Sequence, residues 1–117
     1  MKKIAIFLFL LAMGGCSGAN PDSSTDYKKL VENGALVVDV RTDDEFSSGH
    51  IDGALHIPYE DIEQIADHEG VSKDTTLVLY CRSGRRSGIA KDTLDAAGYT
   101  NVYNAGGYGD IKSALGK

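Results

Sequence analysis

A single cysteine begins the most positively charged stretch of this sequence. Cys81 is followed within five residues by three arginines and a glycine, in the run Cys-Arg-Ser-Gly-Arg-Arg-Ser that ends at Ser87. A thiol reacts as its thiolate, and nearby cations and inward-pointing backbone N–H groups lower the pKa of a thiol. The pattern therefore predicts a reactive cysteine that handles an anionic group. The alternative is an inert cysteine that fills the end of a strand, but such a residue needs no arginine-rich loop.

The elements expected around Cys81 favour the reactive interpretation. The apolar run 75–80 predicts a buried strand that leads directly into Cys81, and Ser87 is expected to cap the helix that follows. Ligands of parallel α/β sheets bind beyond the carboxyl ends of the strands. We expect Gly84 to let the loop curl, so that its amides and the positive end of the helix surround the sulfur.

Strands and helices alternate along the rest of the chain. Helices are predicted at 27–32, 59–68 and 111–115, and between Ser87 and Gly98, where Ile89, Ala90, Leu94 and Ala97 are expected to face inward. Further strands are predicted at 35–38, 54–57 and 102–103. Residues 41–49 are expected to form a charged connection. This order indicates an α/β fold with a mostly parallel central sheet and helices on both faces. A chain of 117 residues has room for one such domain.

The sequence resembles the single-domain rhodaneses, a family of sulfurtransferases. Besides the loop that begins at Cys81, the matching motifs are Val38-Asp39-Val40-Arg41, Glu45-Phe46, Gly49-His50-Ile51, Gly53-Ala54, Ile57-Pro58 and Asn104-Ala105-Gly106-Gly107. The resemblance implies the three-layer rhodanese fold and a persulfide on Cys81. That persulfide would carry sulfur from a donor such as thiosulfate to an acceptor such as cyanide or a thiol. It implies no metal and no organic cofactor.

The resemblance also suggests roles for individual residues. The substrate-binding loop would comprise Arg82, Ser83, Gly84, Arg85, Arg86 and Ser87. Arg85 and Arg86 would orient an oxyanionic donor, whereas Arg82 could equally be a solvated surface residue. Architectural roles, rather than a Cys-His-Asp triad, are expected for Asp39, Arg41, Glu45 and His50. The glycines Gly106 and Gly107 are expected to permit a close backbone approach near the loop.

Two alternative functions follow from the same residues. Phosphatases and arsenate reductases of this fold have a longer loop, with the arginine six residues after the cysteine. Here that position is Ser87, and the loop ends with Arg86 at five residues, which gives a cradle better matched to a sulfur atom than to phosphate. The other alternative is a non-enzymatic docking module or sulfur carrier at the cell envelope, but the presence of Cys81 favours chemistry.

The N-terminus has the form of an export signal. Lys2 and Lys3 precede an apolar run over 4–13, which as a helix would span about 15 Å, too short for a membrane anchor. Met13-Gly14-Gly15-Cys16-Ser17 resembles a bacterial lipobox, which implies lipidation of Cys16; cleavage after Ala19 by an ordinary signal peptidase is the alternative. We thus expect a signal peptide at 1–15, a linker at 16–26, the rhodanese domain at 27–117, and a periplasmic or envelope location with a lipid anchor.

Charge and cysteine content restrict the partners. Without Lys2 and Lys3, ten basic residues stand against seventeen acidic ones, a net charge of −7. That balance argues against nucleic acid and anionic lipid, so membrane contact is expected only through the lipid anchor. With Cys16 acylated or removed, Cys81 has no internal disulfide partner. The expected partners are a small sulfur-containing anion, a thiol or cyanide acceptor, and a protein redox partner; the sequence leaves oligomeric state open.

Overall fold

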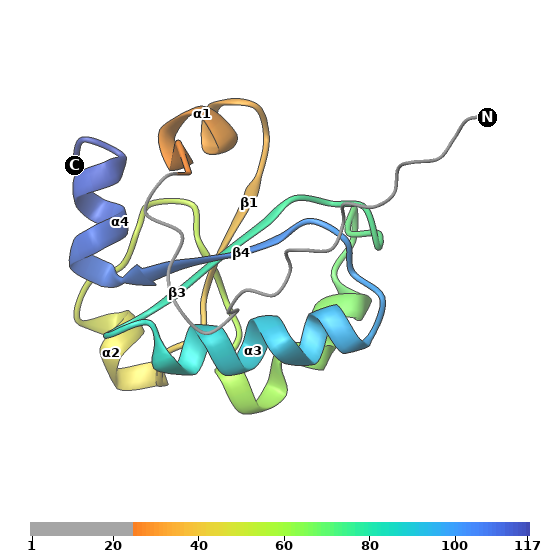
Figure 1. Ribbon diagram of the computed structural model, residues 1–117. Coiled ribbons are helices and arrows are strands. Elements are labelled where there is room, and N and C mark those ends of the chain that lie inside the picture. The colour runs from red at the N-terminus through yellow and green to blue at the C-terminus, as the bar shows by residue number, and fades with distance from the viewer. Residues whose placement is uncertain (1–24) are drawn as a thin grey trace.

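A parallel sheet with helices on both faces forms the framework of the protein (Figure 1). The computed structural model describes residues 25–117. All strand pairs are parallel, in the order β2-β1-β3-β4, and the strands are β1 (Leu36–Asp39), β2 (Leu55–His56), β3 (Leu77–Cys81) and β4 (Val102–Gly107). The predicted three-layer α/β architecture is therefore confirmed.

Within residues 25–117, five helices surround the sheet, two on each face and one short helix at the carboxyl edge. They are α1 (Tyr27–Glu32), α2 (Asp43–Ser47), the 3-10 helix η2 (Tyr59–Asp67), α3 (Arg85–Ala96) and α4 (Tyr108–Ala114). α3 and η2 cover one face, and α1 and α4 cover the other (Figure 1). The central strand β3 is buried at every residue, which explains why its sequence is an uninterrupted apolar run.

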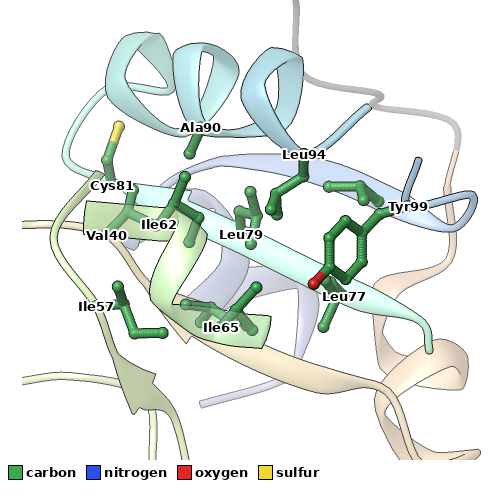
Figure 2. Packing of buried hydrophobic residues seen from close by; sticks show 12 residues of the cluster. Val40, Ile57, Ile62, Ile65, Leu77, Leu79, Cys81, Ala90, Leu94 and Tyr99 are labelled. Carbon is green, nitrogen blue, oxygen red and sulfur yellow. The ribbon is translucent and has the colours of Figure 1, made fainter. Parts of the chain in front are cut away.

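Cys81 lies at the end of the hydrophobic core between the sheet and α3. This cluster includes Leu79 of β3, Ile62 of η2, and Ala90 and Leu94 of α3. Figure 2 shows Cys81 at one end of the cluster, with its sulfur directed toward the beginning of α3. Packing between β3 and α3 therefore fixes the position of the Cys81 side chain.

The connection over 41–49 contains a short helix that the sequence analysis did not predict. In α2, Thr42 is the N-cap and forms a reciprocal capping box with Glu45. None of the five residues of α2 is fully buried, so the helix has no apolar periodicity to reveal it. The predicted helix at 59–68 is instead the 3-10 helix η2, in which Ile62 and Ile65 lie three residues apart on the buried side.

The beginning of α3 differs from the prediction and corrects the role of Ser87. The helix begins at Arg85, after Gly84, which has a φ of 99° and is the N-cap residue. Ser87 therefore lies inside the first turn, where it is buried, and does not cap the helix. The face toward the sheet carries Ser87, Ala90 and Leu94, at spacings of three and four, so the predicted inward residues Ile89 and Ala97 are exposed.

The predicted export signal, the lipidation site Cys16 and most of the linker lie outside the described residues, so the division of the chain stays a prediction. At the beginning of the described part, Asp26 accepts a hydrogen bond from the Lys29 amide at 3.1 Å and caps α1. Between residues 25 and 117, no helix has the length and apolar character needed to cross a membrane.

Candidate active site

The carboxyl ends of three adjacent strands meet at Cys81. β1 ends at Asp39, β3 ends at Cys81, and Cys81 is in register with Gly107, the last residue of β4. The loop that follows Cys81 then turns into α3, whose N-terminal end points back toward the sulfur (Figure 2). This is the edge at which parallel α/β sheets bind ligands.

Hydrogen-bond donors surround the sulfur of Cys81, as the sequence analysis predicted for the loop. The Gly84 amide donates to Sγ at 2.9 Å, and the Ser87 hydroxyl lies 3.5 Å from it. Burial raises the pKa of the Cys81 thiol, but the Ser87 hydroxyl and the amides of Ser87, Gly84 and Ser83 together lower this pKa below its ordinary value. The cradle therefore favours a thiolate even though the Cys81 side chain is fully buried.

A buried polar network supports the cradle from β4. Ser87 Oγ lies 2.7 Å from Asn104 Oδ1, which competes with the Cys81 sulfur for the single hydroxyl proton, and Asn104 Nδ2 donates to the Gly84 carbonyl at 3.0 Å. Asn104 is only 2% exposed and also accepts from the Gly106 amide. Its amide thus holds both the hydroxyl and the loop residue that contact the sulfur. The sequence analysis noted Asn104 only within a motif, although a polar residue next to an expected buried strand was a usable signal.

The loop also rests directly on the end of β4. A Cβ atom placed on Gly107 would lie 2.4 Å from the Arg82 carbonyl oxygen, closer than nonbonded atoms approach. The prediction that the glycine pair permits a close backbone approach is therefore confirmed at Gly107. The Arg82 carbonyl can lie this close to β4 only because residue 107 has no side chain.

Arg86 is held in an ion pair that crosses from α3 to α2. Its Nη1 donates to Glu45 Oε1 at 2.8 Å and its Nη2 to Glu45 Oε2 at 3.1 Å. The hydrogen bond from Arg86 is the main reason that the pKa of Glu45 falls to about 2. The pKa of Arg86 is raised, chiefly by Glu45 and further by the charge and hydrogen bonding of Cys81. The carboxylate therefore holds the guanidinium at both of its terminal nitrogens.

The other two arginines of the loop are free of such contacts. Arg82 and Arg85 are exposed, and their side chains form no hydrogen bond or ion pair with any residue in 25–117. Their guanidinium groups can therefore bind an anion without first breaking a contact within the described part of the chain. A direct contact of Arg85 or Arg86 with substrate stays a prediction.

The Asp39 and Arg41 side chains form a buried pair beside the site. Arg41 Nη2 lies 2.6 Å from Asp39 Oδ2 and also donates to the Gly49 carbonyl at 2.6 Å. Its guanidinium carbon is 4.7 Å from the centre of the Tyr108 ring. These contacts tie the end of β1 to the loop after α2 and to α4, an arrangement that favours the architectural role.

His50 is also engaged away from the sulfur. Its Nδ1 is 2.9 Å from the Phe46 carbonyl oxygen, and its ring stacks on that of Phe46 with centroids 3.7 Å apart. A Cys-His-Asp triad is therefore not formed, because Cys81 Sγ accepts from loop amides and Ser87 rather than from His50. Within residues 25–117, His, Cys, Asp and Glu side chains make no group of three that could hold a metal ion.

These features define a class: parallel α/β proteins with a cysteine at the end of a strand, followed by a short loop whose amides face the sulfur and which leads into a helix. Comparison with known families agrees, since the rhodanese-like domain family matches residues 23–114. The chain belongs to this family.

Similar proteins include several named sulfurtransferases. Thiosulfate sulfurtransferase PspE of Escherichia coli is 39% identical over 74 residues, which cover 63% of this chain and 71% of PspE. The putative mitochondrial thiosulfate sulfurtransferase of Schizosaccharomyces pombe is 38% identical over 115 residues, or 89% of this chain and 74% of that protein. The structure "rhodanese with anions from E. coli" has a TM-score of 0.62 and 41% identity, covering 66% and 91% of the two chains.

Proposed function

We propose that this protein is a thiosulfate sulfurtransferase that moves a sulfane sulfur through a persulfide on Cys81. The observation that carries the proposal is the cradle, in which the Gly84 amide and the Ser87 hydroxyl lower the pKa of a fully buried thiol. Relatives at 32–39% identity carry the same activity in their names, which supports the substrate class.

The proposed reaction has two displacement steps. The Cys81 thiolate attacks the outer sulfur of thiosulfate, the sulfur–sulfur bond of the donor breaks, and sulfite leaves with the bonding electron pair. Cyanide or an acceptor thiolate then attacks the outer sulfur of the persulfide, and the bond to Sγ breaks to regenerate the thiolate. Because thiolate and persulfide are both anions, the same amides and the N-terminal end of α3 stabilise the site in each state.

Arg85 and Arg82 are the best candidates to bind the oxyanion end of the donor. Both side chains are exposed and free of contacts with residues 25–117, whereas Arg86 is paired with Glu45. Guanidinium groups bind such oxyanions through charge-assisted hydrogen bonds. The name of the similar E. coli structure, "rhodanese with anions", says that this rhodanese binds anions, which supports an anion site in the present protein as well. The burial of Cys81 favours a small donor over a bulky one.

Intact mass spectrometry after thiosulfate treatment tests the proposal. The full chain should gain about 32 Da, the mass of one sulfur atom, and lose it on addition of cyanide with formation of thiocyanate. A Cys16→Ser variant should behave in the same way, and a Cys81→Ser variant should gain nothing. A chain that stays unmodified, or that hydrolyses an aryl phosphate and forms no thiocyanate, contradicts the proposal.

We also propose that the domain is exported and anchored by lipid on Cys16. The support is the sequence alone: the basic and apolar start followed by a lipobox-like segment. In bacterial cells, the full chain should separate with the membrane fraction and a Cys16→Ser variant should not. Equal distribution of the two proteins contradicts the lipid anchor.

A further inference from the structure

The ion pair between Glu45 and Arg86 joins two elements beside the sulfur. Glu45 Oε1 accepts three hydrogen bonds, from Arg86 Nη1 at 2.8 Å, the Thr42 amide at 2.9 Å and Thr42 Oγ1 at 3.1 Å. One carboxylate thus closes the N-terminal turn of α2 and holds the first turn of α3. The two side chains are only 23% and 18% exposed, so solvent and salt screen their attraction less than at an open surface.

This pairing changes what Arg86 can offer to the site. Arg86 lies in the first turn of α3, next to Ser87, whose hydroxyl is 3.5 Å from the Cys81 sulfur, yet both terminal nitrogens of Arg86 donate to Glu45. A guanidinium that is neutralised in this way attracts a second anion less strongly than a free one. Arg82 and Arg85, which lack such a partner within residues 25–117, keep their full positive charge.

We propose that Glu45 is a positioning residue of the sulfur site: its two-point ion pair limits the positive charge that Arg86 presents to the Cys81 sulfur and to an anionic donor. The expected effect on donor binding rests on the proposed function, whereas the expected effect on the Cys81 thiol does not. A transferase that must bind an anionic donor and release an anionic product gains from such a limit, because excess positive charge would also retain the product.

The variant Glu45→Gln removes the charge of the Glu45 side chain while keeping its shape. Glutamine removes the negative charge and can still take the reciprocal position in the capping box with Thr42. Arg86 then keeps its charge beside the sulfur. We expect the thiol pKa of Cys81 to fall further and the KM for thiosulfate to fall by roughly two- to fivefold, the range for a partly exposed charge pair. A merely structural Glu45 would give the opposite result, a higher KM.

Arg86→Gln is the complementary variant. It leaves the Glu45 carboxylate unpaired near the sulfur, so the thiol pKa of Cys81 should rise and the KM for thiosulfate should increase. Adding Glu45→Gln to Arg86→Gln should reverse the rise in the thiol pKa, because neither charge then remains. This comparison also keeps the inference testable if Glu45→Gln alone fails to fold.

The control is Thr42→Ala, which removes the hydroxyl of the capping box and leaves the carboxylate on Arg86. It should lower stability without moving the thiol pKa or the KM for thiosulfate.

The deciding measurement is a thiolate absorbance titration of the full chain and its variants, combined with KM values for thiosulfate. The titration requires no turnover, so failure to form thiocyanate would count against the proposed function only. A thiol pKa that rises or stays the same in folded Glu45→Gln, or that shifts equally in Thr42→Ala, would overturn the inference about Glu45.

Discussion

The Cys81 sulfur is contacted by residues three and six positions further along the chain, Gly84 and Ser87. The spacing of cysteine and glycine was sufficient to predict that a loop amide would face the sulfur, as the 2.9 Å contact from Gly84 shows. The hydroxyl of Ser87 was assigned to helix capping instead, because a serine ahead of an apolar stretch usually has that role. The helix begins three residues earlier than expected, with Gly84 and not Ser87 as its cap, and this shift turns Ser87 toward the sulfur.

Replacing Ser87 with alanine should weaken the thiolate. The variant loses a side-chain donor that lowers the pKa of the Cys81 thiol, so this pKa should rise. Turnover with thiosulfate should fall roughly two- to tenfold at neutral pH, the range for one hydrogen bond, and recover at higher pH. The pH profile of kcat/KM measures this effect, with Ser113→Ala on the exposed side of α4 as the control. An unchanged profile in Ser87→Ala would show that the hydroxyl has no part in activating the thiol.

At the scale of elements, the loop after Cys81 packs closely against β4 at Gly107. We expect Gly107→Ala to lower the free energy of unfolding by about 1–3 kcal/mol, as for other overpacked sites, because its Cβ would collide with the Arg82 carbonyl. Gly109→Ala is the matched control: no atom lies within 4 Å of its Cβ position in α4, and alanine should stabilise that helix by about 0.5–1 kcal/mol. Urea denaturation of both variants measures the difference, and equal stabilities would mean that the loop moves freely.

The buried strands were the elements that the sequence predicted best. β1 and β3 are continuous apolar runs covered on both faces, a pattern that few other structures share. β4 extends to Gly107, well beyond the predicted 102–103. The prediction was too short because the second half of the strand contains Asn104 and glycines, which have low strand propensity. Asn104 and Gly107 are held in the strand by the polar network and by the close packing of the loop. Because these contacts come from residues far away in the sequence, the local sequence does not predict them.

For the stability of the whole molecule, the ion pair between Glu45 and Arg86 gives a prediction about acid unfolding. The pKa of Glu45 is about 2 in the folded protein, against an ordinary 4.5. A lowered folded pKa contributes stability that is present above the ordinary value and is lost as the pH falls toward 2. The free energy of unfolding should therefore decrease more steeply between pH 5 and pH 2 in the unaltered protein than in Glu45→Gln. Parallel curves from urea denaturation would show that the ion pair contributes no stability.

The central claim is that backbone amides and the Ser87 hydroxyl lower the pKa of the buried Cys81 thiol below its ordinary value. The most direct test is the difference in ultraviolet absorbance between the full chain and its Cys81→Ser variant as the pH is raised, since tyrosines and Cys16 contribute to both proteins and cancel. We predict one thiolate step below the pKa of free cysteine. A step at or above that value would contradict the account.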